Sequence, residues 1–270
     1  MPDTSTPLHP NTSTQPPYPL THAFQLRPQG DLIAFTGGGG KTSLLFALSY
    51  ELAAAGRAVA GTPTTRIATG EVLRAPAYCL AGSLAGLDEK LATQRFVVIV
   101  GAVGHDKAKS VPIDLPAALL ARPDVDYVLV EADGAKMLPV KAPGDHEPVV
   151  PPETTLLVPV VGIDALSAPL ETIAHRPYLL ARLLDLSLHE TLTPAHVAHL
   201  LSSSDGALRN APAQARIVPF INKVETDAQL AQAREIARLT LARPDLDPRV
   251  QRIVVGAVQS ERPVRDIVHR

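Results

Sequence analysis

The chain has 270 residues, of which 46% are hydrophobic and 19% are charged, so it can bury a large core without disulfides or a structural metal. Lys and Arg number 25 against 27 Asp and Glu, and aromatic residues make up 4%. This balance excludes a basic, base-stacking surface for nucleic acid as the main function. The single cysteine, Cys79, excludes an internal disulfide framework and a multi-thiolate metal site.

The chain contains no apolar run near the roughly 18 residues that a membrane span needs. Its first residues also lack the basic-then-apolar order of a secretion signal. We therefore expect a cytoplasmic protein that binds neither a membrane nor nucleic acid.

Residues 1–28 are rich in Pro, Ser and Thr, and they predict a disordered tail before a folded domain over 29–270. From Asp31 onward, Val- and Ile-rich runs alternate with helical spacing. Strands are predicted over 31–35, 57–61, 96–100, 126–131, 155–161, 215–221 and 250–256. Helices are predicted over 42–55, 114–121, 177–186, 194–202 and 226–242.

Several of these predicted strands are apolar throughout, which is typical of strands covered by helices on both faces. The pattern predicts an α/β fold with a doubly wound, mostly parallel sheet of the P-loop NTPase kind. Residues 162–212 contain helical segments without an intervening strand, so we expect a small helical insertion there.

A glycine run connects the first predicted strand to the first long helix, in the order DLIAFTGGGGKTSLLFAL over residues 31–48. Glycines allow a backbone to fold around a phosphate, and the start of the helix adds its positive dipole end. A lysine at this place reaches the β- and γ-phosphates, and a threonine hydroxyl joins the Mg²⁺ shell. The expected nucleotide-binding residues are Gly37, Gly38, Gly39, Gly40, Lys41, Thr42 and Ser43.

The loop departs from the usual G-x-x-x-x-G-K-[ST] spacing, because Phe35 stands where the first glycine is expected. It resembles the Gly-Gly-x-Gly-Lys-Thr variant of the dimerising nucleotide-switch ATPases and GTPases. Members of that group that carry a signature lysine have it where this chain has Thr36. A homodimer is therefore left open.

Two acids follow a later apolar strand, in the sequence DYVLVEADG over residues 126–134. Glu131 is expected at the carboxyl end of a central strand, where it would hold Mg²⁺ together with Thr42. Asp133 is expected to orient the attacking water, and the Gly134 N–H to sense the γ-phosphate. Lys41 and Asp133 are thus the predicted catalytic residues.

A possible base-reading sequence, INKVE, ends the strand predicted over 215–221. Many GTPases read guanine with Asn-Lys-x-Asp after a strand, and here the corresponding residues are Asn222, Lys223 and Glu225. Glutamate is one methylene longer than aspartate. The nucleotide can therefore be ATP or GTP.

The motifs GGGGKTSL, TPTTRI, VEADGAKMLPVKAP, HEPVVPP, VVGIDAL, HRP, TPAHVAHLLSSSDGAL and INKVE occur in this order. Together they resemble the YqeC-like family of selenium-dependent hydroxylase accessory proteins, over roughly residues 30–258. The resemblance implies a role in the maturation of selenium-dependent molybdenum hydroxylases. It also implies that a molybdenum hydroxylase or its cofactor is a partner.

A polar loop follows the two acids and contains Lys136, Lys141, Asp145, His146 and Glu147 among prolines. It is interpreted either as a solvated surface loop or as a segment that binds an anion and couples nucleotide state to a partner.

Three activities remain open at this point. The first is an Mg²⁺-dependent nucleoside triphosphatase. The second is a small-molecule kinase or nucleotidyl-transferring enzyme, with an acceptor pocket formed by Arg176, Arg182 and the helical insertion. The third is a scaffold that senses a nucleotide without hydrolysing it.

Overall fold

The structure is a computed structural model that describes residues 18–270. Within these residues a ten-stranded sheet has the order β14-β13-β12-β9-β1-β7-β2-β5-β4, with β11 paired to β9. All of its pairings are parallel except that of β13 with the last strand, β14. The strands are β1 (Leu32–Gly37), β2 (Val59–Pro63), β4 (Tyr78–Leu80), β5 (Phe96–Val100), β7 (Tyr127–Glu131), β9 (Leu156–Gly162), β11 (Arg216–Ile217), β12 (Phe220–Asn222), β13 (Arg252–Gly256) and β14 (Val264–His269).

Two short pairings lie outside the main sheet. They join β8 (Val140–Lys141) to β10 (Ala174–His175) and β3 (Ile67–Ala68) to β6 (Lys107–Ala108). The helices are α1 (Leu20–Ala23), α2 (Lys41–Ala54), α3 (Thr69–Leu73), α4 (Leu87–Gln94), α5 (Leu115–Leu120), η1 (Ile163–Leu166), α6 (Leu170–Ile173), α7 (Pro177–Leu184), α8 (Pro194–Ser202) and α9 (Asp227–Leu241).

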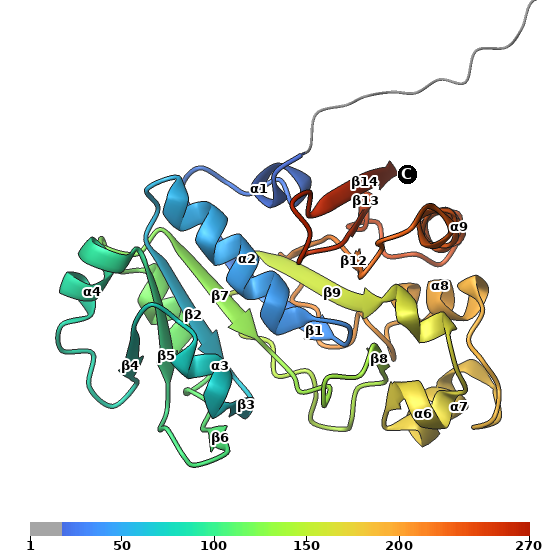
Figure 1. The fold of residues 1–270 in the computed structure, drawn as a ribbon, viewed down its shortest axis with the longest axis horizontal. Coiled ribbons are helices and arrows are strands. Elements are labelled where there is room, and N and C mark those ends of the chain that lie inside the picture. Colours follow the sequence, from blue (N-terminus) through green and yellow to red (C-terminus); the bar gives the residue numbers. More distant parts are fainter. Residues whose placement is uncertain (1–17) are drawn as a thin grey trace, which may run out of the picture.

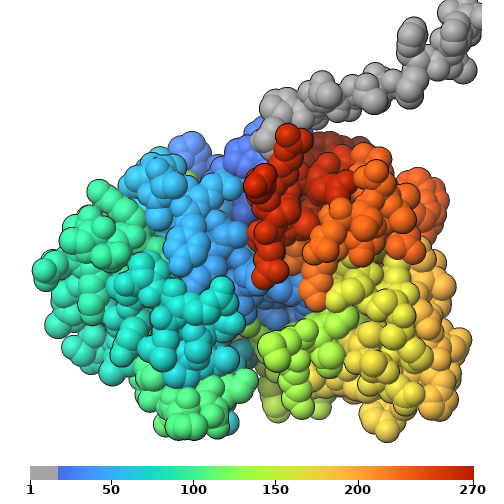
Figure 2. Space-filling model, viewed as in Figure 1, coloured from blue at the N-terminus to red at the C-terminus, as the bar shows by residue number. Residues whose placement is uncertain are grey.

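Helices cover both faces of the sheet, and the alternation along β1 shows why. Leu32 and Ala34 face a core that includes apolar residues of α4, α5, α8 and α9, whereas Ile33 and Phe35 face a core shared with α1 and α2. The segment from β2 to β6 lies at one end of the molecule, and the segment from β9 onward at the other (Figures 1 and 2). The predicted doubly wound, mostly parallel α/β fold is confirmed.

The predicted strands and helices are all present, with ends shifted by a few residues. The segment predicted as one strand over 215–221 is divided into β11 and β12. The range expected to be a helical insertion contains η1, α6, α7 and α8, and also the two-residue β10. The C-terminal β14 was not predicted.

The predicted disordered tail extends too far toward the domain. Residues 1–17 lie outside the described part of the chain, but α1 and Phe24 are packed on the domain, with Leu20 and Phe24 no more than 1% exposed. The Glu51 carboxylate of α2 accepts hydrogen bonds of 2.8 Å from the N–H groups of Leu20 and Thr21. A few apolar side chains and this carboxylate are enough to fix residues that composition alone assigns to the tail.

The topology determines where functional residues can meet. Strand β1 lies between β7 and β9, and β12 lies on the other side of β9, all parallel. The carboxyl ends of these strands, which carry the glycine loop, the two acids and the INKVE sequence, therefore meet at one edge of the sheet. Among residues 18–270, no helix is both long and apolar enough to cross a membrane.

Candidate nucleotide-binding site

The glycine loop is held tightly against the strands beside it. Gly39 has φ +77°, and a Cβ there would lie 2.1 Å from the backbone nitrogen of Gly162. Gly40 has φ +112°, and a Cβ there would lie 2.6 Å from Nδ2 of Asn222. A side chain at either position would therefore strain the backbone and displace a neighbouring strand end.

Several glycine N–H groups already have protein acceptors. The N–H of Gly37 donates to Asp133 Oδ2 at 3.0 Å, that of Gly38 to the Val160 carbonyl at 2.9 Å, and that of Gly39 to the Leu138 carbonyl at 3.0 Å. Helix α2 begins directly after the loop, at Lys41. The N–H groups of its first turn have no acceptor within the helix, so they are the donors best placed for a phosphate.

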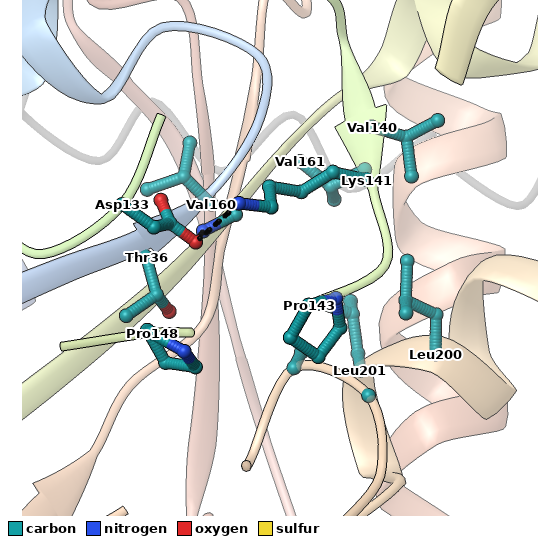
Figure 3. Close-up of a pocket in the computed structure, with 13 residues that line it drawn as sticks. Thr36, Asp133, Val140, Lys141, Pro143, Pro148, Val160, Val161, Leu200 and Leu201 are labelled. Carbon is teal, nitrogen blue, oxygen red and sulfur yellow. Dashed lines mark hydrogen bonds and ion pairs between the residues drawn. The ribbon is translucent and has the colours of Figure 1, made fainter. Parts of the chain in front are cut away.

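A cavity of about 20 Å³ lies beside the loop (Figure 3). Its polar lining comes from Thr36, Gly37, Asp133 and Lys141, and the remainder is largely apolar. The Thr36 hydroxyl is buried and has no hydrogen-bond partner among the described residues. A cavity of this size has room for about one water molecule.

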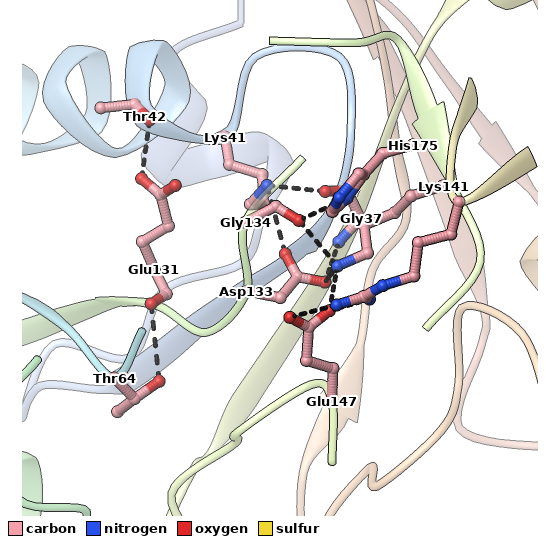
Figure 4. Close-up of polar contacts among 11 residues, drawn as sticks. Gly37, Lys41, Thr42, Thr64, Glu131, Asp133, Gly134, Lys141, Glu147 and His175 are labelled. Carbon is pink, nitrogen blue, oxygen red and sulfur yellow. Dashed lines mark hydrogen bonds and ion pairs between the residues drawn. The ribbon is translucent and has the colours of Figure 1, made fainter. Parts of the chain in front are cut away.

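Lys41 is 4% exposed, and its ammonium group lies within the loop. It donates to the Gly37 carbonyl at 2.6 Å and lies 3.2 Å from Asp133 Oδ1 (Figure 4). The predicted catalytic residues Lys41 and Asp133 are therefore in direct contact. An ammonium group held here, at the start of a helix, can neutralise phosphate charge.

Glu131 ends β7 and faces α2. Its Oε2 accepts a hydrogen bond of 2.6 Å from the Thr42 hydroxyl, and the side chain is buried. Burial raises the pKa of Glu131 above its usual 4.5, and the nearby Lys41 ammonium and the Thr42 bond offset only part of that rise. A cation bound here would stabilise the ionised carboxylate.

The residues predicted to hold Mg²⁺ fit that role chemically. Thr42 and Glu131 supply a hydroxyl and a carboxylate oxygen that already touch, and hard oxygen donors are the ligands Mg²⁺ prefers. The described residues contain no group of three or more His, Cys, Asp or Glu side chains arranged for a metal ion. Mg²⁺ would therefore depend on nucleotide phosphates and water for its other ligands.

A charged network extends from Asp133 into the polar loop. Lys141, on β8, is 1% exposed at its side chain and lies 3.2 Å from Asp133 Oδ2. It also donates to the Gly134 carbonyl at 2.8 Å and to the Glu147 carboxylate. Arg176 contacts both oxygens of Glu147. The interpretation of this loop as a solvated surface segment is thus wrong for Lys141, whereas Asp145 and His146 are exposed.

The electrostatics of this network favour a fully charged state. Burial opposes ionisation of Glu147, but hydrogen bonds from Arg176 and Lys141 outweigh it and lower its pKa from 4.5 to about 2. Burial and the nearby charges of Lys141 and Arg176 lower the pKa of His175. Its ring contacts the Gly134 carbonyl at 3.1 Å.

The INKVE residues lie beside the glycine loop in three different settings. Asn222 is 2% exposed, donates to the Gly39 carbonyl at 2.8 Å and accepts from the Val258 N–H at 3.1 Å. Lys223 pairs with Asp164 Oδ2 at 2.6 Å. The Glu225 side chain is exposed.

A pocket beside the loop brings these residues together with the helix start. Gly40 and Ser43 line one side, and Asn222, Lys223 and Glu225 line another. The segment after β13, residues 257–259, completes it. Sequence reasoning identified this pocket's loop and INKVE residues but missed the segment after β13.

Sequence reasoning also missed Asp164 and the buried setting of Lys141. Asp164 belongs to the VVGIDAL motif and holds the Lys223 ammonium. Lys141 belongs to the VEADGAKMLPVKAP motif, whose lysine pattern alone does not show which amine is buried. Of the expected acceptor pocket, Arg182 and other residues of the helical segment line a hollow beside α7, whereas Arg176 does not line that hollow and holds Glu147 instead.

Comparisons with known proteins agree with the family that the motifs resemble. The model of the YqeC protein family matches residues 33–178. The YqeC protein of Escherichia coli (strain K12) is 31% identical over 229 residues, which span 84% of this chain and 88% of that protein. Among solved structures, FtsY from Mycoplasma mycoides matches at 12% identity and a TM-score of 0.31, over 92% of this chain and 66% of that one.

Proposed function

The chain belongs to the YqeC family, and we propose that it is an Mg²⁺-dependent nucleoside triphosphate-binding protein that hydrolyses its nucleotide. The observation that carries this proposal is the meeting of four side chains where β1 passes into α2. Lys41 contacts Asp133, and Thr42 contacts Glu131, all four within one edge of the sheet. This is the arrangement of charges and hydroxyl that phosphoryl chemistry with Mg²⁺ requires.

Each residue of the proposed site has a separate role. The first-turn N–H groups of α2 bind phosphate oxygens, and Lys41 neutralises charge at the β- and γ-phosphates. Thr42 and Glu131 hold Mg²⁺, which when bound neutralises charge on the phosphate oxygens. Asp133, released from Lys41 by a phosphate, positions the attacking water.

The pocket beside the loop is the proposed base site. Asn222 fixes the loop to this pocket, Lys223 offers its aliphatic stem to the base, and Glu225 can accept from the base edge. Because the Glu225 side chain is exposed, it can reorient toward adenine or guanine. ATP and GTP are therefore both candidate nucleotides.

We also propose that the protein is an accessory factor in the maturation of selenium-dependent molybdenum hydroxylases. Family membership and the resemblance of the ordered motifs to that family support this role. Nucleotide binding would drive a maturation step on a molybdenum hydroxylase or its cofactor. The same proposal includes a cytoplasmic location for the protein and its assembly as a homodimer.

Calorimetric titration of the full chain with ATP and GTP, with and without Mg²⁺, tests the nucleotide proposal. We expect Mg²⁺ to increase affinity, and a tenfold preference, about 1.4 kcal/mol, to identify the base. Lys41→Ala should abolish tight triphosphate binding, whereas Lys107→Ala, at an exposed lysine, should leave it intact. Undiminished affinity in Lys41→Ala would defeat the assignment.

A multiple-turnover assay of phosphate release with Mg²⁺ tests hydrolysis separately. Release of free phosphate supports the triphosphatase. Binding without any release would instead identify a nucleotide-sensing scaffold, and transfer of phosphate or nucleotide to a small molecule would identify a transferase.

A further inference from the structure

We propose that Lys141 completes a subsite for the terminal phosphate of a nucleoside triphosphate, so that this chain supplies two lysines to that phosphate. The inference rests on the proposed nucleotide site and adds to it a residue and a ligand group. The subsite consists of Gly37, Lys41 and Lys141, arranged around the Asp133 carboxylate (Figure 4).

The Asp133 carboxylate shows what this arrangement of donors binds. It receives the Gly37 N–H at 3.0 Å, and it lies 3.2 Å from the Lys41 ammonium and 3.2 Å from the Lys141 ammonium. One backbone amide and two ammonium groups that converge on a carboxylate are equally suited to a phosphate oxygen. The terminal phosphate of a triphosphate would compete with Asp133 for these donors.

Lys141 is fixed in position before any ligand arrives. Its side chain is 1% exposed, and the Gly134 carbonyl and the Glu147 carboxylate hold its ammonium from the other side. Arg176 in turn fixes Glu147 through both carboxylate oxygens. A lysine held in this way loses little further side-chain entropy when it binds an anion.

The two ammonium groups of the subsite share one carboxylate. Lys41 and Lys141 each lie 3.2 Å from an oxygen of Asp133, and Glu147, which Arg176 holds, pairs only with Lys141 of these two lysines. Lys141 and Gly37 also line the cavity beside the loop, next to the buried Thr36 hydroxyl, which has no hydrogen-bond partner within residues 18–270 (Figure 3). A phosphate oxygen that takes the place of Asp133 would pair with both ammonium groups in a setting shielded from water.

The test compares triphosphate with diphosphate affinity, because only the terminal phosphate should contact Lys141. AMPPNP, GppNHp, ADP and GDP are titrated into the full chain with Mg²⁺, for wild type, Lys141→Met and the control Lys136→Met. Lys136 is an exposed lysine of the same loop. In Lys141→Met we expect triphosphate-analogue affinity to fall about tenfold or more, with diphosphate affinity within about threefold of wild type. In the control we expect neither to change.

Equal losses for triphosphate and diphosphate, or no loss, would overturn the proposal. Wild type that binds none of the four nucleotides would instead overturn the proposed function. Thermal unfolding shows whether Lys141→Met folds. If it does not, Lys141→Met combined with Glu147→Gln removes one charge of each sign, and the same selective loss is expected from it.

Discussion

The ammonium of Lys41 lies 3.2 Å from the Asp133 carboxylate, and both side chains are nearly fully buried. A triphosphate that binds Lys41 must therefore displace a carboxylate from it. Asp133 also accepts from the Gly37 N–H and contacts Lys141, so its displacement affects the loop that leads to β8. Nucleotide binding at Lys41 is therefore coupled to the polar loop through the Asp133 side chain.

Replacement of Asp133 by Asn should strengthen triphosphate binding and slow hydrolysis. The variant removes the negative charge that competes with phosphate, while its amide oxygen can still accept from Gly37. We expect affinity to rise about tenfold, and turnover to fall about a hundredfold or more because the attacking water loses its positioning group. Calorimetry and phosphate release measure the two effects.

Asp145→Asn is the matched control, since Asp145 is an exposed aspartate of the same loop and should alter neither quantity. Unchanged turnover in Asp133→Asn would remove Asp133 from the hydrolytic role. Weaker binding would show that Asp133 helps to bind the phosphates and does not compete with them.

The sequence predicted the fold well because the strands that build it are short, buried and apolar. Each central strand is flanked by glycine, proline or polar residues, so its period and its ends are visible along the chain. The same reasoning could not predict β14, whose residues 265–268 are only half-buried and which pairs antiparallel at the sheet edge. It also could not detect α1, which is four residues long and depends on tertiary contacts with α2.

Glu131→Gln should stabilise the protein at neutral pH and above, and it should remove the Mg²⁺ dependence of nucleotide affinity. The pKa of Glu131 in the folded chain is raised by burial, so stability is lost as pH rises from its usual 4.5 through the folded value. Glutamine carries no charge and avoids that loss. At neutral pH and above, we expect the melting temperature of the variant to be higher, by roughly 2–4 °C for each kcal/mol gained in the free energy of unfolding. Near pH 4 we expect no difference.

The same variant should show equal nucleotide affinity with and without Mg²⁺, because an amide is a poor substitute for a carboxylate ligand. Melting curves across pH and calorimetry with Mg²⁺ measure the two effects. A melting temperature that falls at neutral pH would show that the Glu131 charge stabilises the fold. Retained Mg²⁺ dependence would place the ion elsewhere.

Site residues were predictable from the sequence where one backbone element carries them. The glycine loop with Lys41 and Thr42 is contiguous, and Glu131 follows a single strand. Lys141 was not predictable in this way, because its burial depends on its contact with Glu147. Glu147 is in turn held by Arg176, which is 35 residues farther along the chain than Lys141. Only the folded chain brings these charges together.

Glu147→Gln should destabilise the protein at neutral pH but not in strong acid. Burial disfavours the charged form, yet bonds from Arg176 and Lys141 lower the pKa of Glu147 from 4.5 to about 2. A lowered carboxyl pKa contributes stability above the unfolded value, and this contribution is lost as pH falls from 4.5 toward 2. Urea unfolding of both proteins measures the difference, which should narrow over that window. A difference that does not depend on pH would mean that the charge of Glu147 is not the cause.

Asn222→Ala should weaken both the fold and nucleotide binding, without a change in base preference. The Asn222 side chain is 2% exposed, donates to the Gly39 carbonyl and accepts from the Val258 N–H. Its removal leaves both backbone groups without their partner, at a cost of about 1–3 kcal/mol for each unsatisfied group. Because Asn222 holds the loop and the segment after β13, ATP and GTP should lose affinity by the same factor.

Urea unfolding and titration with both nucleotides test this prediction, and Gln94→Ala, at an exposed amide at the end of α4, is the control for loss of a surface amide. In the control, stability and affinity should stay at wild-type values. A stable Asn222→Ala protein that discriminates differently between ATP and GTP would contradict the prediction. In that case Asn222 would read the base directly, and the loop would be held by its contacts with Asp133, Leu138 and Val160.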